Sequence, residues 1–366
     1  MYVIFFVTIL SLIIVYLDSQ GNLKGGLKYA FFLLGLISAI HYNYGNDYID
    51  YFDGFQEYQH YSLSDVLSNT VQRNNEIGWA LINWSLYQLF GVKGFFVLVA
   101  IIAVVENWAF YQLINRFVPR NLWYIGIAVY LLSVGQYVMF FSMMRQGIAV
   151  AIIVIGYIFY IQRKKVIPAV LMVLLASLFH GSAIIFIPFC FIGFFKLENS
   201  KVIVAVLAAL FVLFLISREA LDAFLGIFMA NELVSNYADT YSNNNFVLSI
   251  GLGWLVKLIP FLVILGYLYN NTDKGPIRQL ALIAAMSAMV IPFTQSLHMI
   301  SRLQHYFSIF ELVTIPCTFV AIKDKTVRNA LLILLFIQRG YDYFIFFRSP
   351  GWAESYTYFH TVFEAL

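Results

Sequence analysis

Charged residues are scarce in this chain. Lys, Arg, Asp and Glu make up 11% of its 366 residues, whereas soluble domains carry about one-quarter. The longest polar stretch, residues 42–76, is too short to form a core of its own. Basic residues occur only in short groups, so no surface for nucleic acid is expected. The sequence therefore excludes a separate soluble domain and a nucleic-acid-binding module.

Cysteines and the common catalytic motifs are also few. Cys190 and Cys317 both lie inside apolar runs, so we expect packing residues and no disulfide. The chain contains no P-loop, no dinucleotide fingerprint, no His-x-x-x-His metal pair and no Gly-x-Ser-x-Gly elbow. We therefore expect an activity that needs neither a cofactor nor a bound metal.

Apolar residues make up 61% of the chain, and its mean hydropathy is +0.81. The apolar runs are continuous rather than alternating, which predicts an all-α, polytopic helical integral membrane protein. A span needs about 20 apolar residues. We expect about twelve spans in a single transmembrane domain over residues 1–366, at 2–17, 28–41, 95–115, 122–141, 147–162, 166–179, 182–195, 202–217, 246–270, 279–297, 304–321 and 328–347.

Two runs need separate treatment. Residues 2–17 lack the basic start and the small-residue cleavage site of a signal peptide, so we expect a retained first span. Residues 77–92 are short, aromatic and interrupted by polar residues, which favours a helix lying in the membrane interface. This helix would belong to an external loop at 42–94.

Basic loops give the orientation. If 77–92 does not cross, the expected spans place every basic short loop on one side, which the positive-inside rule makes the cytoplasm. Both termini then lie outside, with the external loop 42–94 and a second external loop at 218–245. The halves of 166–195 are thin enough to form a re-entrant hairpin instead of two crossings. The basic loops are Lys24/Lys28, Arg116/Arg120, Arg163–Lys165, Lys196/Lys201, Lys274/Arg278 and Lys323/Lys325/Arg328.

Three short polar sequence motifs, or words, interrupt the apolar runs on the side predicted to be outside. They are centred on Arg145, His180 and Arg302. A charge at such a place usually faces a water-filled cavity and has a function there. Two arginines on one face suggest a bidentate site for a diphosphate, although each can also be a snorkelling anchor at a helix end. His180 can act as a general acid or base, or it can be an ordinary buried histidine.

Acids and tyrosines alternate in the external loop. Asp47, Tyr48 and Tyr51 follow the second run, and Glu76 precedes the interfacial helix. These residues can begin a solvated loop, and Glu76 can favour the helix N-terminus that follows it. In the functional alternative, carboxylates bind sugar hydroxyls and aromatic faces pack against sugar rings, so one carboxylate activates an acceptor hydroxyl.

The order of these words resembles the EpsG/Wzy-type polysaccharide polymerase family. Over roughly residues 1–340 the chain shows Gly-x-Asp-Tyr-x-x-Tyr at 45–51, Glu-x-Gly at 76–78, Arg-Gln-x-x-Ala at 145–149, Phe-His-x-Ser-Ala at 179–183 and Arg-x-x-x-Tyr-Phe at 302–307. The chain departs from the family at His41, where the family usually has an arginine. A permanent cation is thus replaced by a titratable one.

The resemblance implies a GT-C-like fold and a glycosyltransferase of the bacterial inner membrane whose active site faces the periplasm. Its substrate would be an undecaprenyl-diphosphate-linked oligosaccharide. Its other partners would be membrane lipids and a chain-length regulator. The hydroxyl of an incoming repeat would attack the growing chain, and undecaprenyl diphosphate would leave. By resemblance, His180, Arg145 and Arg302 are the catalytic candidates. The substrate-binding candidates are Asp47, Tyr48, Tyr51, Glu76, Gln146, Tyr306 and His41.

Other functions stay open at this stage. A lipid-linked glycan ligase uses the same donor chemistry. A flippase or transporter would be expected to show inverted repeats and paired broken helices, and the sequence shows no repeat. A membrane acyltransferase for surface polysaccharide would need its donor path from the cytoplasm, whereas the polar words fall on the other side.

Overall fold

Helices account for nearly all the regular structure of the computed structural model, which describes residues 1–68, 76–194, 200–216, 258–270, 275–290 and 302–365. Within these described residues, four helices are long and apolar enough to cross a membrane, at Tyr2–Ser19, Ile77–Phe117, Met144–Arg163 and Lys325–Arg348, and seven shorter apolar helices accompany them. The prediction of a helical membrane protein is confirmed. The count of about twelve spans stays a prediction.

The described residues form two compact units. Unit 1 holds residues 1–193 and 339–366, and unit 2 holds residues 194–338. Whether they make up the single predicted transmembrane domain stays a prediction. The second predicted external loop, 218–245, lies outside the described residues.

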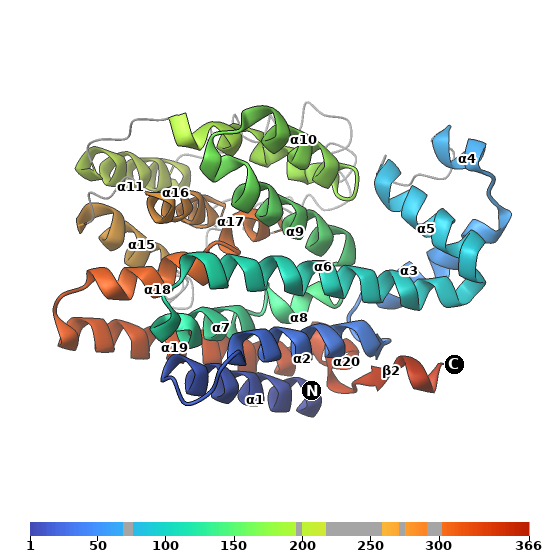
Figure 1. Ribbon diagram of the computed structural model, residues 1–366, viewed down its shortest axis with the longest axis horizontal. Helices are drawn as coiled ribbons and strands as arrows, with labels where there is room; N and C mark the ends of the chain where they lie inside the picture. Colours follow the sequence, from blue (N-terminus) through green and yellow to red (C-terminus); the bar gives the residue numbers. More distant parts are fainter. Residues whose placement is uncertain (69–75, 195–199, 217–257, 271–274, 291–301, 366) are drawn as a thin grey trace. The chain divides into compact units, whose positions relative to one another are not determined.

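Unit 1 is built around one buried helix. α9 (Met144–Phe159) packs against α6 (Gly94–Phe117) on one side and α10 (Val166–Ser177) on another. α6 in turn contacts α2 (Gly26–Ile40), which packs against α1 (Tyr2–Ser19) (Figure 1). The membrane-length segment containing α9 is 78% buried, against 33% for α1. α9 therefore lies at the centre of the unit, where its small and apolar residues pack against the neighbouring helices.

The run predicted as one span at 122–141 is broken, so that prediction is wrong in detail. α7 (Trp123–Leu132) ends at Ser133, whose backbone is extended, and α8 (Tyr137–Phe140) begins after the turn. The Gln136 N–H donates to the Ser133 carbonyl at 2.9 Å. The polar residues and the glycine of this short stretch are typical of a turn. The mean hydropathy of the whole run does not reveal that turn.

Three predicted cytoplasmic loops meet at one end of unit 1. Arg120 donates to the Asp18 carboxylate at 2.5 and 3.0 Å and to the Leu23 carbonyl at 3.0 Å. The Arg116 guanidinium lies 4.8 Å from the centre of the Phe159 ring. These contacts join the C-terminal ends of α1, α6 and α9, and the cytoplasmic position of this end stays a prediction.

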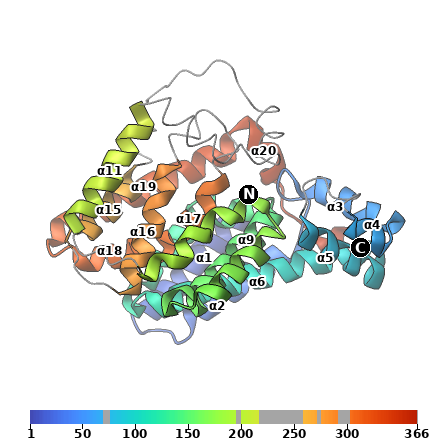
Figure 2. The same cartoon turned by 90° about the horizontal axis from the view of Figure 1, so that it is seen from above.

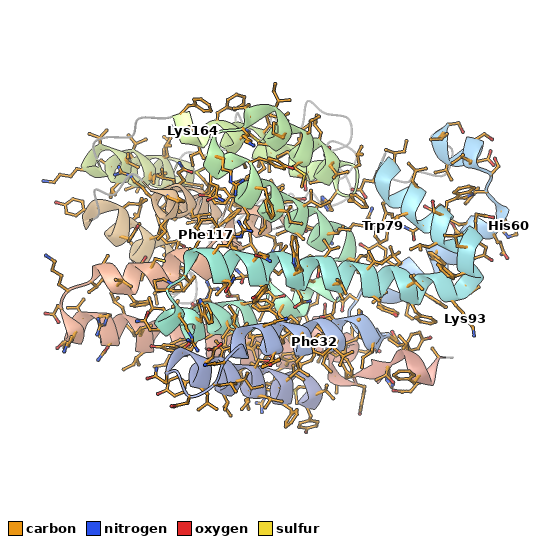
Figure 3. The ribbon with its side chains drawn as sticks, in the orientation of Figure 1. Phe32, His60, Trp79, Lys93, Phe117 and Lys164 are labelled. Carbon is orange, nitrogen blue, oxygen red and sulfur yellow. The ribbon has the colours of Figure 1, made fainter. Side chains whose placement is uncertain are left out.

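The loop predicted to be external, residues 42–94, lies at the opposite end. Figure 3 shows Phe117 and Lys164 toward one end of the unit 1 helices and Trp79 and Lys93 toward the other. The loop contains α3 (Tyr48–Gln56), η1 (Glu57–His60), α4 (Leu63–Leu67) and α5 (Ile77–Phe90), and η2 (Gly91–Lys93) joins α5 to α6. α5 matches the predicted interfacial helix closely in its bounds.

The C-terminal segment closes onto the start of this loop. β2 (His360–Thr361) pairs antiparallel with β1 (His41–Tyr42), and His41 is opposite Thr361. α20 (Pro350–Thr357) precedes β2, and the Gly45 N–H donates to the Ser355 carbonyl at 3.0 Å. Residues beyond the recognised motifs thus hold the Gly45–Tyr51 word in place.

Unit 2 is a smaller helical bundle. α15 (Ile259–Asn270) packs against α11 (Ser200–Ile216), α16 (Pro276–Met289) and α18 (Glu311–Ala321), and α17 (His305–Ser308) contacts α16 (Figure 2). A buried hydrogen bond crosses it, because Ser287 Oγ donates to Glu311 Oε1 at 3.0 Å. α19 (Lys325–Arg348) begins in unit 2 and ends in unit 1.

Candidate functional site

Arg145 joins three of the sequence words in unit 1. Its Nη1 donates to Glu76 Oε2 at 2.6 Å, and its Nε donates to the Tyr51 hydroxyl at 3.2 Å. The guanidinium carbon lies 5.5 Å from the centre of the Tyr51 ring. The Arg145 side chain is 21% exposed and that of Glu76 10%. We call Tyr51, Glu76, Arg145 and the turn Phe179–Gly181 the Arg145 cluster.

A fourth word, Phe-His-x-Ser-Ala at 179–183, enters the cluster through its backbone. The Gly181 N–H donates to Glu76 Oε1 at 3.2 Å. Both oxygens of Glu76 are therefore held, one by a guanidinium and one by an amide. His180 lies one residue earlier, and its Nδ1 is 2.7 Å from Ser182 Oγ. His180 is partly exposed, next to the Gly181 amide that binds the Glu76 carboxylate.

A close backbone contact explains the glycine of the Glu-x-Gly word. The N–H groups of Gly78 and Trp79 both donate to the Leu178 carbonyl, at 2.9 and 3.2 Å. A Cβ at Gly78 would lie 2.8 Å from Leu178 Cβ and 3.0 Å from that carbonyl oxygen. Only glycine allows the start of α5 to approach the α10 turn so closely.

The Gly-x-Asp-Tyr word is anchored beside α9. The Asp47 N–H donates to Ser142 Oγ at 3.0 Å, just before the helix that carries Arg145. Gly45 has φ of +113°, and a Cβ there would lie 2.7 Å from Ser142 Cβ. Both the left-handed backbone and the contact require glycine. Ser142 was not identified from the sequence, because a serine inside an apolar run gives no distinct signal.

Two opposing effects act on the pKa of the Glu76 carboxyl. Burial raises the pKa of the Glu76 carboxyl above its ordinary value, while the Arg145 charge and the Gly181 amide oppose the rise. Burial likewise raises the pKa of the Tyr51 hydroxyl against the effect of Arg145. A carboxylate that loses its arginine partner in this setting becomes a stronger base.

Other candidates occupy different environments. Tyr48 is fully buried and donates from its hydroxyl to the His41 carbonyl at 3.2 Å. His41 is 2% exposed, and its Nδ1 lies 2.6 Å from the Ser38 carbonyl. Gln146, next to Arg145 on α9, is also 2% exposed. These three side chains contact protein in the structure, so their predicted role in substrate binding stays a prediction.

Arg302 and Tyr306 belong to unit 2. Arg302 lies in the short turn before α17 and is partly exposed, and Tyr306 on α17 is fully buried. Their role in the site stays a prediction from the sequence. Among the residues that the structure describes, no group of three or more His, Cys, Asp or Glu side chains is arranged to hold a metal ion.

Comparison with known proteins adds a family. The EpsG family model matches residues 28–360, a range that contains every candidate site residue. No curated protein and no solved structure matches the chain. Because the family match covers most of the sequence, the chain belongs to the EpsG family.

Proposed function

We propose that this protein is a membrane glycosyltransferase that polymerises oligosaccharide repeats carried on undecaprenyl diphosphate at the outer face of the bacterial inner membrane. Membership of the EpsG family supports a polysaccharide-polymerase type of membrane protein. The observation that carries the finer proposal is the Arg145–Glu76 pair, which combines a cation for a diphosphate with a carboxylate for an acceptor hydroxyl.

The reaction joins two lipid-linked substrates. The acceptor hydroxyl oxygen attacks the anomeric carbon of the growing chain and forms the new glycosidic bond. The bond from that carbon to the diphosphate oxygen breaks, and undecaprenyl diphosphate leaves with the electron pair. The hydroxyl proton passes to a base. Arg145 stabilises the charge that develops on the leaving diphosphate, and we assign Arg302 to the same task.

Substrate binding changes the partner of Glu76. A diphosphate carries more negative charge than a carboxylate, so it competes for the Arg145 guanidinium. Glu76 then keeps its Gly181 contact but loses the charge that opposed its desolvation. Its pKa rises further, which strengthens it as the base for the acceptor hydroxyl. In this scheme His180, next to Gly181, donates a hydrogen bond to the diphosphate, and Asp47 contacts the acceptor sugar.

The test is glycan length in cells that depend on each variant. Glu76→Gln keeps the shape and the amide contact but removes the charge, so long chains should disappear. Arg145→Ala should have the same effect. Arg116→Ala is the matched control, because Arg116 contacts Phe159 at the opposite end of unit 1. Normal ladders from Glu76→Gln and Arg145→Ala at normal membrane abundance would remove the cluster from the site.

A further inference from the structure

A small cavity lies inside unit 1, behind the start of α9. It is about 10 Å³, room for the centre of about one water molecule. Its polar lining comes from five elements, and its remaining wall is aliphatic and aromatic. The polar lining residues are Ser38, His41, Glu106, Tyr130 and Tyr137.

Glu106 is the unexplained group in this cavity. It lies within α6 and is 4% exposed, and its Oε1 has no hydrogen-bond partner among the described residues. The same oxygen faces α9 so closely that a Cβ at Gly147 would overlap it. Glu106 is an acid inside the apolar run 95–115, and a charge at such a place usually has a function.

The charges around Glu106 do not balance a carboxylate. The cavity wall contains no lysine or arginine. Arg145, on the adjoining turn of α9, pairs with Glu76. His41 Nδ1 lies 2.6 Å from the Ser38 carbonyl oxygen, which can only accept a hydrogen bond. Nδ1 therefore carries a proton in both the neutral and the charged ring, so this contact does not require His41 to be a cation. The other titratable groups facing the cavity are the Tyr130 and Tyr137 hydroxyls, and Tyr137 donates to the Leu34 carbonyl at 3.2 Å.

We propose that this cavity is a proton-binding site, in which Glu106 is a neutral carboxylic acid that shares one internal water with the polar lining. An isolated carboxylate in such surroundings costs many kcal/mol, and the group takes up a proton instead. A polar cavity of this size, with two or more partners, suits one water. A bound metal cation is the alternative ligand, but hard cations require several oxygens, and most of this wall supplies carbon.

The site is separate from the proposed glycosyl transfer, since it holds a proton and a water rather than a substrate. It has one structural consequence for α9. A neutral Glu106 places no internal anion beside the first turn of that helix, whose N-terminal dipole favours negative charge. The dipole at the start of α9 is then not neutralised by Glu106.

Infrared spectroscopy of the purified full-length protein in lipid tests the proposal. At neutral pH the wild type should show the C=O stretching band of a protonated carboxylic acid, and the band should shift in D₂O. Glu106→Gln should remove it, whereas Glu311→Gln, which alters the buried glutamate bonded to Ser287, should leave that band in place. If Glu106→Gln does not insert, Glu106→Asp should shift the band without removing it.

Two results would overturn the proton site. One is a wild-type-minus-Glu106→Gln spectrum that contains carboxylate bands and no acid band. The other is thermal stabilisation of the wild type by sodium chloride over choline chloride that disappears in Glu106→Gln, which would show a cation site. Neither result bears on glycan polymerisation, so the proposed function is tested separately.

Discussion

Arg145 and Glu76 should act as one unit in catalysis, and a double-mutant cycle tests this. Removing one group that stabilises an oxyanion costs about 10²–10³ in turnover, and removing a general base costs about 10²–10⁴. If the residues were independent, the loss in the double variant Arg145→Ala/Glu76→Gln would equal the product of the single losses.

The geometry gives the expected departure from that product. A charge-assisted hydrogen bond such as the 2.6 Å contact between Arg145 Nη1 and Glu76 Oε2 contributes about 1.5–3 kcal/mol. In the proposed mechanism the substrate diphosphate breaks this contact, so each single variant is spared the cost of breaking it, and the product of the single losses counts that saving twice. At 1.36 kcal/mol per factor of ten, kcat/KM of the double variant should therefore be about 10- to 150-fold lower than the product predicts. Arg145→Lys should recover little activity, because lysine lacks the fork that contacts Glu76 and Tyr51 together.

The assay is kcat/KM of the purified protein with lipid-linked repeats, with each variant's insertion and folding checked. A parallel cycle of Glu76 with Arg116 is the control and should be multiplicative, because Arg116 lies at the other end of unit 1. Multiplicative losses in the Arg145–Glu76 cycle would refute the coupling. Full activity of Arg145→Lys would show that a point charge is sufficient, as for a snorkelling anchor.

Three further predictions follow from the described residues. A cysteine at Ser64 should react with an impermeant thiol reagent in intact cells and one at Lys164 only after permeabilisation; labelling of both from the same side would contradict the topology. Gly78→Ala should lower activity strongly, because its Cβ meets Leu178 at 2.8 Å, whereas Gly54→Ala, with no atom within 4 Å, should not; equal activities would show that the close approach is not needed. Polymerisation should survive EDTA, and a complete loss restored by magnesium or manganese would argue against a metal-free reaction.

Hydropathy predicted the helices well because burial in lipid depends on local composition. The run 166–179 became α10 (Val166–Ser177), and the run 77–92 became α5 (Ile77–Phe90). The break between α7 and α8 was not predicted, because a turn at Ser133 depends on specific hydrogen bonds inside an apolar average. The pairing of β1 with β2 joins residues far apart in sequence, and no local pattern reveals it.

The site was predicted as residues but not as contacts. Tyr51, Glu76, Arg145 and His180 were all identified from their words, yet the ion pair between residues 76 and 145 depends on the tertiary fold. Tyr48 and His41 contact each other, since the Tyr48 hydroxyl donates to the His41 carbonyl, and their role in substrate binding stays a prediction. Glu106 was not identified from the sequence, because the apolar run around it dominates the mean hydropathy. A single acid inside such a run is nevertheless a signal of function.

Reconstitution of the reaction with wild-type protein is the most direct test of the central claim. Purified protein in lipid vesicles would receive undecaprenyl-diphosphate-linked repeats as the only sugar source, and both glycan length and free undecaprenyl diphosphate would be measured. We expect a ladder of polymers with one undecaprenyl diphosphate released for each new glycosidic bond. Absence of a ladder, or transfer of glycan only to a different lipid or protein acceptor, would contradict it.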